Sequence, residues 1–239
     1  MTDVGTARQS PPSATNQPLQ FGDGPLSRAA ANVYTVLVVG LFLVLATLPG
    51  LVPLALLDRD VSNLPLVALC AVPFGPALSA AVYALHHRRN DITDLAPAAA
   101  FVRGYRVNVR GALALWLPAL AWLTVVAVTL ANFAAAGVPG WWAVLLVVIA
   151  AAVTMWGVLA LVVTSLFDFR IRDVARLAAF FLGAEPRVTV GVAALLFVAV
   201  GVTLLLSEVV LLLAAPLFVL ALVRTCAPMI GRIKAEFTE

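Results

Sequence analysis

The chain has 239 residues, of which 63% are hydrophobic and only 11% are charged. Soluble domains carry about 25% charged residues, so a soluble protein of this size could not cover its apolar surface. Because basic residues near apolar segments serve as topology signals, the net charge of +3 does not indicate nucleic-acid binding. We therefore expect an all-α, polytopic membrane helical bundle whose main partner is the lipid bilayer.

The first part of the chain combines a polar tail with two apolar segments. Residues 1–32 are rich in Ser, Pro, Gly, Thr and Gln, a composition typical of a disordered tail. A spanning helix needs about 20 apolar residues, and the segments 33–57 and 64–85 both meet this length. We predict that they are the first two spans, separated by the polar link 58–60.

Two more apolar segments follow at 111–135 and 141–166, joined by a turn without any charge. Trp141 and Trp142 begin the second of these segments. Tryptophan gathers at membrane–water interfaces, so the pair marks the level at which this segment enters the bilayer. The two segments are the predicted third and fourth spans.

The last apolar stretch holds 36 residues, about 54 Å of helix, whereas the hydrocarbon core is about 30 Å thick. Its only polar break is Ser207-Glu208, which predicts two short spans at 188–206 and 209–227. The alternative is one long helix with a re-entrant part. Residues 228–239 would then form a cytoplasmic C-terminal tail.

The basic residues predict the orientation of these six spans. Fourteen of the fifteen Lys and Arg residues lie before the first span, between the second and third, between the fourth and fifth, or in the last turn of the sixth span and beyond it. Only Arg59 lies in a segment on the other side. Since positive charge is enriched in cytoplasmic segments, we expect a multi-pass protein of the cell membrane with both termini in the cytoplasm.

Both long inner connections show the pattern of an amphipathic helix. Arg103, Arg106 and Arg110 recur at i, i+3 and i+7, on one face of a helix, and residues 169–178 mix charged and apolar residues similarly. We expect two cytoplasmic amphipathic helices, on the inner leaflet or against the ends of the spans. The candidate contacts with a partner protein or with lipid headgroups are Arg88, Arg89, Arg103, Arg106, Arg110, Arg170, Arg172 and Arg176.

The second span contains Pro73, Gly75 and Pro76 among many small residues. Small residues let neighbouring helices approach closely, and prolines free backbone carbonyls that must find partners inside the protein. These three residues are a candidate hinge, and a packed kink is the alternative.

Glu208 is the only acidic residue within the apolar regions and is a candidate polar membrane residue. A carboxylate inside a bilayer is costly and would suggest a proton or cation site. The predicted topology favours a hydrated position at an outer turn.

Sequence motifs of catalysis and of cofactor binding are absent. The chain has no glycine-rich dinucleotide motif, no phosphate-binding loop and no nucleophile elbow. Cys70 and Cys226 are too few for the usual four-cysteine metal site, and the adjacent His86 and His87 point about 100° apart on a helix. We expect no enzymatic activity, no cofactor and no metal.

The region from Pro73 to Ala112 resembles the YesL-like family of bacterial integral membrane proteins, a domain of unknown function. The resemblance rests on a proline-containing second span with small residues, a basic end, an acidic link and an aromatic, basic inner helix. The residues that carry it include Pro73, Gly75, Pro76, Ser79, His86, His87, Arg88, Arg89, Asp91, Phe101, Tyr105, Arg106 and Arg110. The match is most specific over 72–116 and extends in general layout over about 30–225.

The resemblance implies a six-span inner-membrane protein without established activity. Genes of such proteins often accompany genes for sugar uptake and polysaccharide use, which suggests an accessory role there. We therefore expect a non-catalytic protein accessory to the transport of a small solute, with carbohydrate as the favoured class. The alternative is a membrane scaffold or signalling protein that docks a cytoplasmic partner through its inner amphipathic helices.

Overall fold

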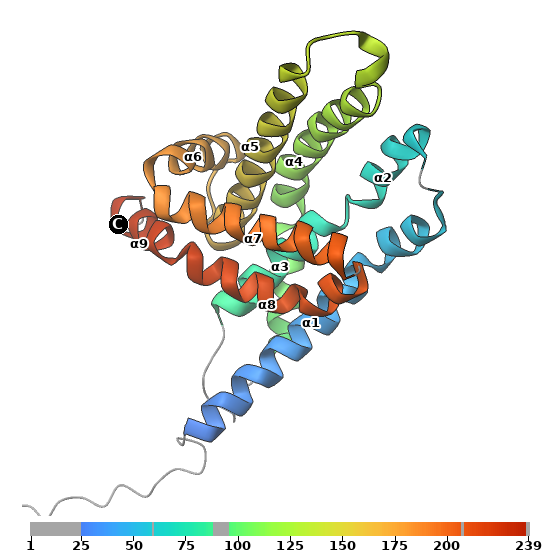
Figure 1. The fold of residues 1–239 in the computed structure, drawn as a ribbon. Coiled ribbons are helices and arrows are strands. Elements are labelled where there is room, and N and C mark those ends of the chain that lie inside the picture. Colours follow the sequence, from blue (N-terminus) through green and yellow to red (C-terminus); the bar gives the residue numbers. More distant parts are fainter. Residues whose placement is uncertain (1–24, 59, 88–95, 207, 238–239) are drawn as a thin grey trace, which may run out of the picture.

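The computed structural model describes residues 25–58, 60–87, 96–206 and 208–237, and this part of the chain contains helices and no strand (Figure 1). The helices, in chain order, are α1 (Pro25–Leu56), η1 (Val61–Asn63), α2 (Leu64–Cys70), α3 (Phe74–His86), α4 (Pro97–Ala131), η3 (Phe133–Ala136), α5 (Trp141–Leu166), α6 (Ile171–Ala184), α7 (Pro186–Leu205), α8 (Glu208–Thr225) and α9 (Ala227–Phe237). The predicted all-α bundle is confirmed.

Five segments are long and apolar enough to cross a membrane, which makes the chain a multi-pass membrane protein. They are Ala29–Leu56, Val61–His86, Pro97–Ala131, Trp141–Leu166 and Pro186–Leu205. A sixth span results if Val209–Thr225 and Ala227–Glu236, which meet at an angle of 46°, count as one bent span. The last apolar stretch is thus two helices, with the turn at the predicted place.

Helix α3 lies at the centre of the bundle and contacts α1, α4, α5 and α8 (Figure 1). Four alanines of this helix are at most 1% exposed: Ala77, Ala80, Ala81 and Ala84. Small side chains allow helix axes to approach closely, and this close approach is the main source of attraction between helices in a bilayer. The small residues of the second span therefore explain why four helices surround α3.

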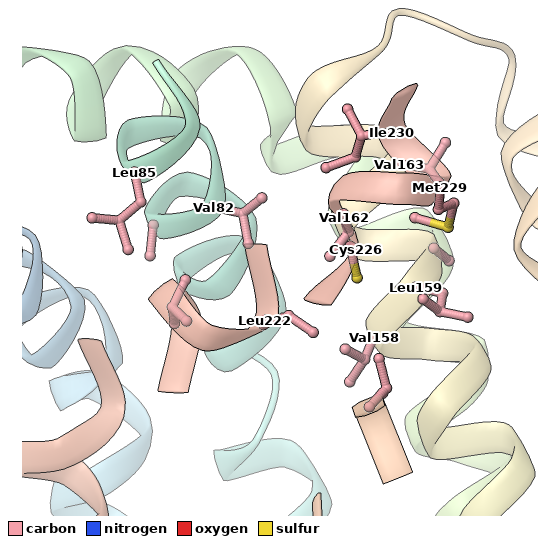
Figure 2. Close-up of a cluster of buried hydrophobic side chains, with 14 of the residues drawn as sticks. Val82, Leu85, Val158, Leu159, Val162, Val163, Leu222, Cys226, Met229 and Ile230 are labelled. Carbon is pink, nitrogen blue, oxygen red and sulfur yellow. The ribbon is translucent and has the colours of Figure 1, made fainter. Parts of the chain in front are cut away.

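The packed core lies toward the end of the bundle where α3 ends and α4 begins. In Figure 2, side chains of α3, α5, α8 and α9 converge, with Cys226 beside Val162 and Met229 beside Val163. The halves of α5 and α7 that lie farther from this core expose apolar side chains, such as Val144 and Leu204. Lipid chains satisfy such surfaces, so the bundle is well packed at one end and lipid-facing toward the other.

The first predicted inner helix is not a separate element, which corrects the expected boundary at residue 111. Helix α4 runs without interruption from Pro97 to Ala131, so the basic segment and the third span form one helix of 35 residues. Pro97 occupies the first turn, where a missing amide hydrogen costs nothing. No proline follows before Pro118, and Gly111 alone does not end the helix. The span also stops at Ala131 rather than at 135.

Both predicted tails are shorter than expected. Helix α1 begins at Pro25, a favourable first helical residue, so residues 25–32 belong to the first helix. Residues 1–24 lie outside the described part of the chain. At the other end, 227–237 form α9, because Met229, Ile230 and Ile233 bury an apolar face against the core.

Two short turns at the lipid-facing end have clear local causes. Gly137 has φ of +61°, a left-handed conformation that glycine adopts without steric cost, and it ends η3. Asp60 caps η1 by accepting hydrogen bonds from the hydroxyl and the amide of Ser62, at 2.6 and 2.8 Å. These hydrogen bonds lower the pKa of the Asp60 carboxyl.

Substitution of glycine at the α3–α4 contacts is expected to destabilise the fold. A Cβ atom at Gly75 would lie 2.5 Å from Cγ of Trp116, and one at Gly104 would lie 2.8 Å from Cβ of Tyr83. Gly75→Ala and Gly104→Ala should each cost about 1–3 kcal/mol through overpacking. Thermal unfolding in detergent would detect this as a fall of about 2–4 °C in midpoint per kcal/mol.

The matched control is Gly201→Ala in α7, where an added Cβ meets no atom within 4 Å. Alanine is the better helix former by about 1 kcal/mol, so this variant should be as stable as the parent or more stable. Equal midpoints for the variants at Gly75, Gly104 and Gly201 would contradict the close approach of α3 and α4.

Candidate functional site: the basic end of the bundle

The proline-containing part of the second span forms a break between two helices. Helix α2 ends at Cys70 and α3 starts at Phe74, so Pro73 immediately precedes the second helix and Pro76 lies in its first turn. The carbonyl of Ala71 accepts a hydrogen bond of 3.0 Å from Nε1 of Trp116 on α4. The predicted candidate hinge thus coincides with the break, and a neighbouring helix satisfies a carbonyl at this point.

For two buried residues on α3 and α4, Ser79 and Asn108, no polar role was predicted from the sequence. Asn108 donates from Nδ2 to the carbonyl of Ser165 at the end of α5, over 3.3 Å. Ser79 is fully buried, and its hydroxyl has no hydrogen-bond partner among the described residues. Asn108 shares a helix face with Gly104 and Ala112, at four-residue spacing, and this pattern of small residues was the available signal.

The basic part of α4 extends past the end of α5. The Asn108–Ser165 hydrogen bond places Asn108 level with the last turn of α5. Residues 97–107 precede it, and as helix they add about 16 Å beyond this level. We call Pro97–Arg110 the α4 stem.

The α4 stem presents three predicted site residues together. Arg103, Arg106 and Arg110 are all exposed, and Val107 between them is 69% exposed. None of the three arginines forms an ion pair with a described residue. The opposite side of the stem packs through Phe101 against Phe42 of α1, with ring centroids 5.8 Å apart. The predicted basic face is therefore available for binding.

The other predicted arginines lie on or next to α6. Arg172 and Arg176 are exposed on this helix, and Arg170 immediately precedes it. The buried face, Val174, Ala178 and Phe181, packs on α5, where Nε1 of Trp156 donates a 3.0 Å hydrogen bond to the carbonyl of Ala175. The second predicted amphipathic helix is thus a separate element, but one that folds back along α5.

Helix α9 forms an ion pair with the turn between α6 and α7. Arg232 forms ion pairs with Glu185 in that turn and with Glu236 one helical turn further on. Its guanidinium carbon also lies 5.9 Å from the ring centroid of Phe181. No local sequence pattern pairs Arg232 with a residue 47 positions away, because only the tertiary packing of α9 brings the two residues together.

Three predicted site residues lie wholly or in part outside the described residues. Arg88 and Arg89 lie outside the described residues, and so does the side chain of Glu208, whose backbone begins α8.

The described residues contain no group of three His, Cys, Asp or Glu side chains that could hold a metal ion. The rings of His86 and His87 are 5.3 Å apart at 76°, and Nδ1 of His87 lies 3.0 Å from the carbonyl of Tyr83. Cys70 and Cys226 are both free thiols in buried positions. These residues are used in packing and in local backbone contacts.

Comparison with protein-family models, with curated proteins and with solved structures finds no match for this chain. The resemblance to the YesL-like family therefore remains an expectation from the sequence.

The hydrogen bond at the break in the second span can be tested by removing its donor. Trp116→Phe keeps the aromatic ring but leaves the Ala71 carbonyl without this partner, so we expect a loss of about 0.5–1.5 kcal/mol in unfolding free energy. Trp122→Phe on the same helix is the control, because Trp122 is 53% exposed. An unfolding midpoint of Trp116→Phe no lower than that of the control would contradict a stabilising role.

Proposed function

We propose that this protein is a non-catalytic component of the cell membrane, with both termini in the cytoplasm, that docks a partner protein through its basic end. The observation that supports the proposal best is the α4 stem. It continues a spanning helix without a break and carries Arg103, Arg106 and Arg110 on one exposed face. The orientation rests on the enrichment of positive charge in cytoplasmic segments.

The chemistry of this face defines the kind of partner. Arginine binds carboxylates through two parallel hydrogen bonds, so three arginines within about two helical turns suit an acidic protein surface. The exposed side chain of Val107 adds apolar contact between them. Because the stem and the span are one helix, a bound partner would be held rigidly relative to the membrane domain.

We further propose that the partner is a transporter of a small solute, with carbohydrate as the favoured class. This step is supported by the YesL-like resemblance alone. A scaffold that docks a cytoplasmic signalling protein would use the same stem, and the identity of the bound protein separates the two functions.

Reporter fusions test the proposed orientation. A reporter that is active only outside the cytoplasm should be active when it is fused after Gly137 or Glu208. A reporter that is active only in the cytoplasm should be active when it is fused after Asp91, Asp173 or Glu239, because the basic segments stay in the cytoplasm. A C-terminal fusion that reports outside would contradict the six-span arrangement.

Docking at the α4 stem can be tested by photo-cross-linking in native membranes. A photoreactive residue at Val107 should capture one discrete protein, and Arg103→Gln/Arg106→Gln/Arg110→Gln should reduce the yield at least tenfold. A photoreactive residue at Val190 on α7, which is 67% exposed, is the control for non-specific capture.

Two outcomes would count against the proposal. Equal cross-linking in the triple variant, with its C-terminus still cytoplasmic, would contradict docking by the arginines. Unchanged uptake of every tested sugar after deletion of the gene would contradict the transport role and leave the scaffold function as the better account.

A further inference from the structure

Helix α6 is held at the membrane edge by both of its ends. Only residues 167–170 separate it from α5, and only Glu185 separates it from α7. Since α5 and α7 are both membrane-spanning candidates, the short connections keep the two ends of α6 close to the level at which α5 ends and α7 begins. Its 14 residues are about 21 Å long, enough to join the two spans along the membrane surface.

The hydrogen bond from Trp156 to the carbonyl of Ala175 fixes the depth of α6 in more detail. Trp156 is about 22 Å along α5 from Trp141, the residue at the opposite membrane interface, and the hydrocarbon core is about 30 Å thick. The contact at Ala175 therefore lies about 8 Å short of the inner boundary of the hydrocarbon core, within the range of about 5–10 Å to which an interfacial helix is immersed.

The face of α6 that points away from the bundle suits this environment. Arg172, Arg176 and Phe180 recur at i, i+4 and i+8, so they form one stripe on the side opposite the buried residues. Both arginines are exposed, and Phe180 is 60% exposed. Such an exposed aromatic ring beside two cations matches an interfacial helix, whose apolar side chains enter the acyl region while its cations meet the headgroups.

The two arginines are also available for an anionic ligand. Neither Arg172 nor Arg176 forms an ion pair with a described carboxylate, whereas Arg232 nearby in the fold is paired with Glu185. The planar guanidinium binds phosphate oxygens through two hydrogen bonds, in the geometry that a phospholipid headgroup offers.

We infer that the stripe Arg172–Arg176–Phe180 binds anionic phospholipids of the inner leaflet, with the guanidinium groups on the lipid phosphates and the phenylalanine ring among the acyl chains. The inference rests on the proposed position of this end of the bundle at the membrane surface. It assigns α6 to lipid and leaves the α4 stem for the protein partner.

The test measures lipid retention by the purified full-length chain in detergent, where no membrane orientation is required. Native mass spectrometry would record bound lipid after titration with phosphatidylglycerol, with phosphatidylcholine, or with inorganic phosphate at matched concentrations. We expect the protein to retain phosphatidylglycerol and to retain phosphatidylcholine more weakly. Millimolar inorganic phosphate should not displace the bound phosphatidylglycerol. Competition by inorganic phosphate would overturn the assignment to lipid in favour of a free anion.

Matched variants locate the binding surface. Each arginine near a membrane surface contributes about 1 kcal/mol, or roughly fivefold in affinity, so Arg172→Gln/Arg176→Gln should weaken phosphatidylglycerol binding at least fivefold. Phe180→Ser should also weaken it, and Arg103→Gln/Arg106→Gln, with the same loss of charge, should leave it unchanged. The inference would be overturned if the two double variants weakened phosphatidylglycerol binding equally, or if Arg172→Gln/Arg176→Gln did not weaken this binding. Because these readouts do not depend on cross-linking at Val107, failure here is distinguishable from failure of partner docking.

Discussion

Close packing around α3 determines the geometry of the whole bundle. Gly75 lies against Trp116 and Gly104 lies against Tyr83, so α3 and α4 run side by side in opposite directions in a fixed register. Side chains at these glycines would force the helices apart, since overpacking in a dense interior has few low-cost adjustments. The register of α3 and α4 in turn sets the position of α5, through Asn108 and Ser165.

The two ends of the molecule differ in packing and in exposed side chains. At one end the side chains of α3, α5, α8 and α9 form a continuous core, and Arg232 ties α9 to Glu185. At the other end the helices expose apolar side chains that lipid can cover. Because the packed end also bears the arginines, the basic surfaces lie at the end of the protein where the buried core is located.

Most of the fold follows from sequence features that act locally. Runs of apolar residues and the break at Ser207-Glu208 predicted most of the helices and their order. The continuity of α4 was missed because a change from basic to apolar residues suggested a boundary, although nothing at Gly111 stops a helix. Helix α9 was missed because its apolar face acquires meaning only when it packs on the core. The roles of Asn108 and Arg232 were missed for a related reason, since their partners are distant in sequence.

We propose that α4 is one rigid helix that passes from the bilayer into the cytoplasm and carries the basic stem with it. Spin labels at Val107, Leu117 and Val125, all exposed side chains of this helix, test it directly. In liposomes, electron paramagnetic resonance should show that oxygen reaches the labels at 117 and 125 preferentially and that a water-soluble nickel complex reaches the label at 107. A label at 107 that is as inaccessible to the nickel complex as the label at 117 would contradict the claim.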